Sequence, residues 1–212
     1  MTTFTCPQCQ TPVSLWFRHS SLVICPACRY SLRRTTDRWT RHRAEEPMPE
    51  DMTPLRVGVQ GVFEKQTFAI TGRIRYTSAG GYVNRWAIVF ADETTAWLDE
   101  GYGSYAVLWK VTDTKMAGKL TNLKPGKSVT FPQGVKLFVE AVDQVIQIRL
   151  EGELPGYEGE APKFMTVELG NGQQVAARVQ VYTKDKIVIF RGKYLPFKDF
   201  QFKQLRDLRE WV

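Results

Sequence analysis

The residues in this sequence best suited to chemistry are its four cysteines. They form two Cys-x-x-Cys pairs with fifteen residues between them: Cys6 and Cys9, then Cys25 and Cys28. This spacing is typical of a zinc ribbon, in which two tight turns direct four thiolates at one tetrahedral ion. Four thiolates complete the coordination shell and leave no position for water. We therefore expect one structural zinc ion per chain.

The cellular compartment bears on this assignment, because thiols stay reduced in the cytoplasm and paired cysteines there favour metal binding over disulfides. The chain lacks the basic start and apolar stretch of a signal peptide, and no apolar run approaches the roughly 20 residues of a membrane helix. We therefore expect a cytoplasmic protein. His19, in the loop between the cysteine pairs, is an alternative ligand, but four thiolates already complete the shell.

The element that positions the cysteines is a predicted zinc ribbon over residues 1–32. Two short strands, Val13–Trp16 and Ser21–Ile24, lie between the two cysteine turns. A module this small buries too little apolar surface to fold unaided, so the metal supplies much of its folding free energy.

An arginine-rich stretch follows the ribbon, and we predict a linker over residues 33–54 that is first basic and then acidic. The candidate residues for binding an anionic partner are Arg29, Arg33, Arg34, Arg38, Arg41 and Arg43. Two interpretations remain open. The arginines form an arm that binds nucleic-acid phosphates or anionic lipid headgroups, or the acidic stretch Glu45–Asp51 folds back and neutralises them.

The remaining chain is predicted to be mainly β, in two small antiparallel barrel or sandwich units over residues 55–112 and 113–212. In the first unit, Phe68, Ile70, Gly72, Ile74 and Tyr76 alternate onto one strand face. The two units share a loose order of strands and turns, which suggests a duplication. Helical spacing predicts one short helix within residues 113–123 and another within residues 197–212.

The β units offer little for catalysis. Both histidines, His19 and His42, precede them, and no cysteine follows Cys28. This excludes Ser-His-Asp and Cys-His catalysis there. Glu151 and Glu153 remain, because residues two apart on a strand share a face and mutual repulsion raises one pKa for acid–base work. A pair on a solvated strand face is the simpler alternative, so we do not expect an enzyme.

Tryptophans in the β units, interleaved with arginines, suggest a stacking platform for single-stranded nucleic acid. The residues concerned are Trp86, Trp97, Trp109, Trp211, Arg73, Arg75 and Arg85. The aromatic positions mostly share the phase of the aliphatic ones, however, which favours packing in a core.

Several motifs along nearly the whole chain resemble one protein family. They are the Cys-Pro-x-Cys pairs, Gly72–Tyr76, the strand with Trp86, Trp97–Glu100, Glu151–Pro155 and Phe190–Leu195. Together they resemble the DUF4178 family, bacterial proteins of unassigned function. The resemblance implies a zinc ribbon followed by β structure, and an accessory role beside membrane proteins and aminopropyltransferase-like enzymes. This chain has Gly156 and Tyr157 where the family pattern has a tryptophan after Pro155, so the resemblance assigns that loop no role.

We therefore predict a non-enzymatic, zinc-stabilised interaction or adaptor protein in a bacterial cytoplasmic, membrane-adjacent assembly, with a protein as its partner. The alternative is nucleic-acid binding through the ribbon and the arginine stretch. An enzyme that uses Glu151 or Glu153 is the third and weakest hypothesis.

Overall fold

The computed structural model describes residues 2–36, 38–112, 120, 123–131, 134–157, 159 and 163–208. Within them the protein is mainly β and antiparallel, as the sequence predicts. The ribbon strands are β1 (Thr2–Thr5), β2 (Pro12–Leu15), β3 (Leu22–Ile24), β4 (Tyr30–Thr35) and β5 (Arg38–Ala44). The body strands are β6 (Gln60–Phe63), β7 (Gln66–Ser78), β8 (Gly81–Phe90), β9 (Thr95–Gly101), β10 (Ser104–Lys110), β11 (Ser128–Thr130), β12 (Lys136–Val145), β13 (Gln147–Gly152), β14 (Phe164–Gly170), β15 (Val175–Thr183) and β16 (Lys186–Tyr194).

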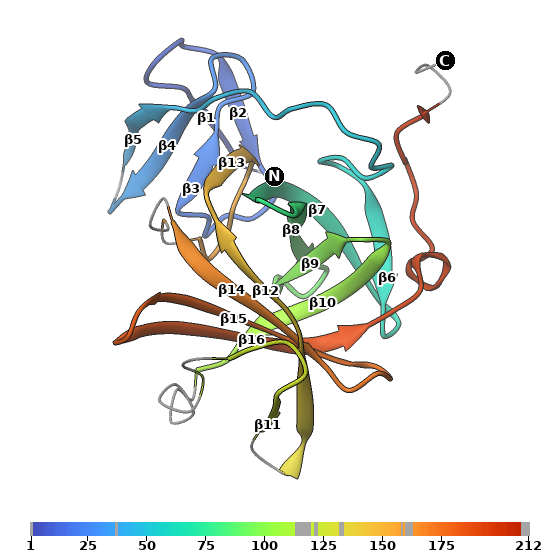
Figure 1. Cartoon of the computed structure of the whole chain (residues 1–212). Coiled ribbons are helices and arrows are strands. Elements are labelled where there is room, and N and C mark those ends of the chain that lie inside the picture. The colour runs from blue at the N-terminus through green and yellow to red at the C-terminus, as the bar shows by residue number, and fades with distance from the viewer. Residues whose placement is uncertain are drawn as a thin grey trace.

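The body strands belong to one 11-stranded sheet (Figure 1). Its order is β11-β12-β14-β15-β16-β10-β9-β8-β7-β13, with β6 paired to β7. Strands from both predicted units therefore pair directly: β10 with β16, and β7 with β13. The sheet curls so that β12, near one end, comes next to β7, near the other end. Ile146, which joins β12 to β13, donates its N–H to the carbonyl of Thr77 at 2.9 Å. The body is thus one curled sheet without a closed barrel, whereas the sequence suggested two small barrel or sandwich units.

The curled sheet buries apolar residues on both faces. The concave face includes Ile74 and Tyr76 of β7, whereas Phe68 and Ile70 of the same strand lie in the cluster on the outer face. A bulge between Ile70 and Gly72 causes this switch, because one extra residue turns every later side chain to the other face. The single apolar face predicted for residues 68–76 is corrected accordingly.

The tryptophans pack mainly in these clusters. Trp86 is fully buried in the outer cluster and Trp97 is buried on the concave face, while Trp109 packs partly buried beside Phe63 and Phe90. Core packing is therefore the role of these three tryptophans, and they do not form the predicted platform for stacked bases.

The ribbon consists of two small sheets, β1-β2 and β3-β4-β5. Its two predicted strands are present as β2 and β3. The arginine stretch differs from the prediction, because residues 30–44 form a hairpin of β4 and β5 and not a linker. Leu32 of β4 is fully buried beside the cysteines, and Trp39 of β5 stacks on Phe4 with ring centroids 4.4 Å apart. These two contacts hold the hairpin on the ribbon.

Neither predicted helix is seen as expected in the described residues. Most of the first, over residues 113–123, lies outside them, as does Trp211 at the end of the second. In the C-terminal segment, a 3-10 turn η3 (Phe197–Phe200) takes the place of the first part of the expected helix, and Leu205 lies in irregular chain. Phe200 is buried against Phe68 of the outer cluster, so aromatic packing holds this segment.

Candidate metal centre and the surfaces beside it

The two Cys-x-x-Cys turns have the same backbone geometry. In the first, the N–H of Gln10 donates to the carbonyl of Cys6 at 3.0 Å; in the second, Arg29 donates to Cys25 at 2.9 Å. Gln10 and Arg29 both adopt positive φ angles, 63° and 57°. Such a turn places its two cysteine side chains on one side, which is the arrangement that a shared metal ion requires.

The four sulfur atoms lie within 4.8 Å of one another. Across the two turns, the Sγ atoms of Cys6 and Cys28 are 3.8 Å apart, and those of Cys9 and Cys25 are 3.7 Å apart. A tetrahedron with metal–sulfur bonds of about 2.3 Å has edges of about 3.8 Å. The spacing predicted from the sequence therefore brings the four thiols to the geometry of a four-coordinate metal site.

In each turn the first cysteine is more deeply buried than the second. Cys6 and Cys25 are fully buried, and Cys9 and Cys28 are half-buried. Hydrogen bonds with Thr11 lower the pKa of Cys9 to about 6, whereas burial raises the pKa of Cys28 to about 12. His19 is not part of this cluster, and its Nε2 accepts a hydrogen bond from Arg18 Nε at 3.0 Å.

Glu153 joins the ribbon to the body. Its carboxylate accepts hydrogen bonds from the N–H groups of Trp16 at 2.7 Å and Phe17 at 2.9 Å, and from the hydroxyl of Ser20 at 2.5 Å. Glu153 is only 2% exposed. Burial raises the pKa of Glu153, and the three donors oppose that shift. The ribbon is thus held against the body by a buried carboxylate and is not merely tethered to it.

Glu151 and Glu153 do not form the acid–base pair that the sequence suggested. Gly152 has a φ of +70° and ends β13, so the backbone turns between the two glutamates. Glu151 forms an ion pair with Arg73 at 2.8 Å, while Glu153 is occupied by donors from the ribbon. A pair poised for proton transfer is not formed by these carboxylates.

The arginine hairpin is largely exposed to solvent. Arg29, Arg34, Arg38, Arg41 and Arg43 are exposed, and Arg33 is partly buried. Arg43 pairs with Glu45 at 2.8 Å. Among the described residues, no carboxylate pairs with the other five arginines. Most of their positive charge is therefore available at the surface.

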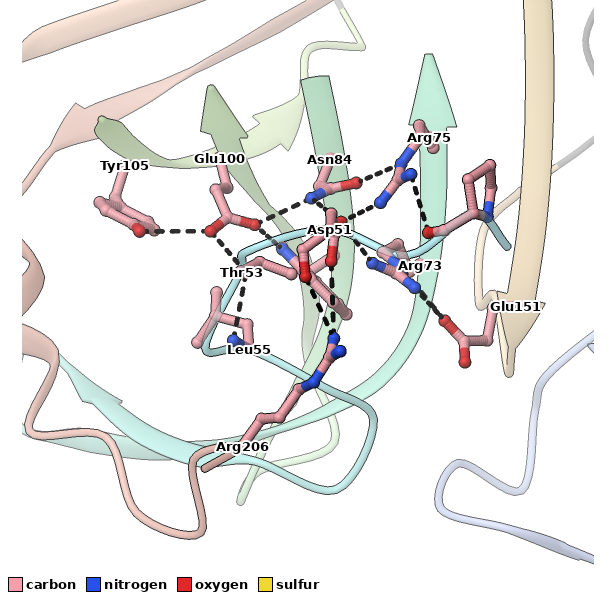
Figure 2. A network of polar contacts seen from close by, with 12 residues as sticks. Asp51, Thr53, Leu55, Arg73, Arg75, Asn84, Glu100, Tyr105, Glu151 and Arg206 are labelled. Atoms are coloured by element: carbon pink, nitrogen blue, oxygen red, sulfur yellow. Dashed lines mark hydrogen bonds and ion pairs between the residues drawn. The ribbon is translucent and has the colours of Figure 1, made fainter. Parts of the chain in front are cut away.

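The acidic residues that follow the hairpin are engaged elsewhere. Glu46 pairs with Arg149 of β13. Asp51 is buried against β7, where its Oδ2 accepts from Arg73 at 3.0 Å and from Arg75, and Arg206 lies near its Oδ1 (Figure 2). Of the acidic residues from Glu45 to Asp51, only Glu45 forms an ion pair with an arginine of the hairpin. The structure thus decides against general neutralisation of the arginine stretch by the downstream acidic residues.

The Asp51 network was not predicted from the sequence. Next to it, Glu100 accepts hydrogen bonds from the hydroxyls of Thr53 at 2.6 Å and Tyr105 at 3.2 Å, and from the indole N–H of Trp86 at 2.9 Å (Figure 2). These contacts hold the segment between β5 and β6 on the outer face of the sheet. No local sequence pattern predicts these contacts, because the partners lie far apart in the sequence.

A cleft of about 570 Å³ lies between the ribbon and the body. Apolar side chains contribute much of its lining, including Val13, Trp16, Met48 and Leu150. Trp16 is 43% exposed, more than the other tryptophans that the structure describes.

Comparison of the chain with protein-family models, with curated proteins and with solved structures finds no significant match. The resemblance to the DUF4178 family therefore stays a prediction. Among the described residues, no helix combines the length and the apolar character that crossing a membrane requires.

Proposed function

We propose that this chain is a non-enzymatic interaction protein in which a structural zinc ion holds a ribbon that binds an anionic partner, nucleic acid. The observation that carries the proposal is the exposed arginine hairpin built directly on the cysteine cluster. Four arginines of the hairpin, and Arg29 just before it, pair with no carboxylate that the structure describes.

The identity of the metal follows from the donor set. Four thiolates select soft or borderline cations, and a tetrahedral sulfur site favours zinc or iron. Zinc suits a purely structural role, because it has no redox chemistry and no open position remains for water or substrate. The metal would hold the β1-β2 and β3-β4-β5 sheets together, since Cys6 and Cys9 come from one turn and Cys25 and Cys28 from the other.

Nucleic acid is the partner best suited to the hairpin. Guanidinium groups form bidentate hydrogen bonds with phosphates, and β4 and β5 present them on adjacent strands. Trp39 of β5 is only partly buried, so an aromatic ring lies among the cations. Cations interleaved with aromatic rings are typical of surfaces that track a single strand.

The test measures binding of a labelled single-stranded oligonucleotide of about 20 nucleotides by fluorescence anisotropy. If four arginines contact phosphates, the slope of log K against log salt is about −3. Affinity then falls about 50-fold between 50 and 200 mM salt. A parallel measurement uses anionic lipid vesicles.

The matched variants change the net charge equally. Replacing Arg34 and Arg38 with Gln removes two cations from the hairpin, and replacing Lys124 and Lys127 with Gln removes two exposed cations elsewhere. We expect the first variant to weaken binding at least about ten-fold and the second to leave it nearly unchanged. Equal losses in both variants, or retention on vesicles without binding of the oligonucleotide, would contradict the proposal.

A protein adaptor is the second candidate, and the cleft between ribbon and body favours it. Trp16 offers the exposed aromatic anchor that interface hot spots commonly use. An adaptor predicts a defined protein that co-purifies with the wild type and is lost with Trp16→Ala, yet is retained by the variant that lacks Arg34 and Arg38. Nucleic-acid binding predicts instead that the variant without Arg34 and Arg38 loses affinity for the oligonucleotide and that Trp16→Ala keeps it.

A further inference from the structure

A polar recess lies where the arginine hairpin meets the body, and we call it the hairpin pocket. Its volume is about 260 Å³, slightly below that of pockets that enclose a drug-sized ligand. The ribbon and the body are fixed to each other beside it, because the N–H of Leu154 donates to the carbonyl of Leu22 at 3.0 Å. The residues whose chemistry matters here are Arg33, His42, Arg43 and Glu45, with Leu150 and Tyr157 on the body side.

A β-bulge in β5 brings two polar side chains to the hairpin pocket. On β5, the partners of Ser31 and Leu32 are Arg43 and Arg41, so His42 is an extra residue. In a regular strand, Arg41 and Arg43 would point to the same face. The bulge instead places Arg43 on the face opposite to Arg41, which lies on the side of the cysteines. His42 and Arg43 accordingly line the pocket, and Arg41 does not.

Arg33 of β4 supplies a guanidinium that is both accessible and unpaired. Among the described residues, its side chain has no ion-pair or hydrogen-bond partner. Only its Nε is buried, so Nη1 and Nη2 keep accessible surface, and the side chain lines the pocket. Nη2 lies against the body, where a Cβ added to Gly159 would be 2.7 Å from it. Removing part of a charged group from water without supplying a partner is unfavourable, so a ligand explains Arg33 better than the fold does.

The other charges of the hairpin pocket also favour an anion. Glu45 is the one carboxylate in the described lining, and it already accepts from Nε of Arg43 at 2.8 Å and from Nη2 at 3.4 Å. Nη1 of Arg43 and the imidazole of His42 have no hydrogen-bond partner in the part of the chain that the structure describes. The pocket thus offers donors from three side chains, and its carboxylate is matched by a cation.

We propose that the hairpin pocket binds the terminal phosphate of a nucleic-acid strand. This inference rests on the proposed nucleic-acid binding and names the part of the strand that the pocket recognises. A terminal phosphate is a monoester, which carries a charge of about −1.5 to −2 at pH 7 and has three acceptor oxygens for Arg33, His42 and Arg43. An internal phosphate carries a single charge and has only two free oxygens, so it satisfies fewer of these donors.

The experiment measures binding of the full-length protein to internally labelled strands of about 20 nucleotides by fluorescence anisotropy. The strands differ only in their ends: one carries a 5′-phosphate, one a 3′-phosphate, and one has hydroxyl groups at both ends. A fourth strand has hydroxyl ends and is two nucleotides longer, so it carries the added charge as internal phosphates. We expect one terminal phosphate to strengthen binding at least about ten-fold and the longer strand to bind like the hydroxyl strand.

Two variants of the hairpin locate the phosphate. Arg33→Gln removes the unpaired guanidinium without breaking a contact to a described residue, so it should fold and lose the preference for the phosphorylated strand. Arg38→Gln is the matched control, because Arg38 lies on the same hairpin but not in the pocket lining. It should weaken binding of all four strands alike and keep the preference.

The outcomes separate the hairpin pocket from nucleic-acid binding itself. Equal binding of all four strands would overturn the pocket assignment and leave nucleic-acid binding intact, whereas failure to bind any strand would overturn both. A preference that survives Arg33→Gln would also overturn the assignment. Vesicles that contain phosphatidic acid present the same monoester on a lipid. Retention on them, without a preference among the strands, would overturn the proposal in favour of a lipid headgroup.

Discussion

Removal of the Asp51 carboxylate is expected to destabilise the protein strongly. The Asp51 side chain is 1% exposed, and it lies between Arg73 and Arg75, whose side chains are 9% and 3% exposed (Figure 2). In Asp51→Asn the amide has nearly the same volume, so the change isolates the charge. Arg73 keeps its ion pair with Glu151, at 2.8 Å. Arg75 loses its only ion-pair partner among the described residues.

The expected magnitude follows from Arg75. An uncompensated buried charge costs about 3–5 kcal/mol. Arg75 still donates to Asn84 at 3.1 Å and to the carbonyl of Pro49 at 3.0 Å, so we place the cost near the lower limit, about 3 kcal/mol. Burial lowers the pKa of Arg75, in agreement with the high cost of a charge at this position. For a chain of this size, such a loss lowers Tm by about 6–12 °C.

Urea unfolding, followed by circular dichroism at pH 7, measures the change in unfolding free energy. Asp185→Asn is the control, because Asp185 is exposed in the turn before β16, and its effect should stay within about 0.5 kcal/mol. Adding Arg75→Met to Asp51→Asn should recover part of the loss, since no buried charge then remains unpaired there. A loss below about 1 kcal/mol in Asp51→Asn, or a further loss in the double variant, would refute this reasoning.

Further predictions concern the joint between ribbon and body. Glu153→Ala leaves three donors without their acceptor and should cost about 3 kcal/mol in urea unfolding, whereas Glu153→Gln keeps one acceptor oxygen and should cost about 1 kcal/mol. Because burial raises the pKa of Glu153 above 4.5, its contribution to stability is complete below that pH and is lost as pH rises through the raised value. The stability of the wild type relative to Glu153→Gln should therefore increase on acidification towards pH 4.5, and a decrease would contradict the assignment. Gly72→Ala should cost about 3 kcal/mol, because the added Cβ overlaps the backbone carbonyl of Glu153; a neutral effect would show that the contact is relaxed at no cost.

The parts of the structure that depend on near neighbours could be predicted from the sequence. The cysteine turns need only their own residues, so their spacing predicted the cluster correctly. The alternation in β7 predicted a strand, but the bulge between Ile70 and Gly72 depends on pairing with β8 and has no local pattern. The strand β5 was missed for a similar reason, since its residues are mostly exposed and polar and it is held by β4 and by the stacking of Trp39 on Phe4.

Contacts between distant residues account for most of what sequence analysis could not reach. Asp51 and Arg73 are 22 residues apart, and Glu153 and Ser20 are 133 apart. Each of these carboxylates looks like an ordinary solvated group in the sequence, since its partner comes from another element.

The zinc content of the purified protein tests the central claim most directly. The protein is purified without chelators or added metal, and its metals are quantified by mass spectrometry of the native chain and by elemental analysis. The four converging thiols predict one zinc ion per chain, lost together with the fold of the ribbon when a strong chelator is added. A chain that carries no zinc, or a ribbon that keeps its fold after complete removal of the metal, would contradict the account.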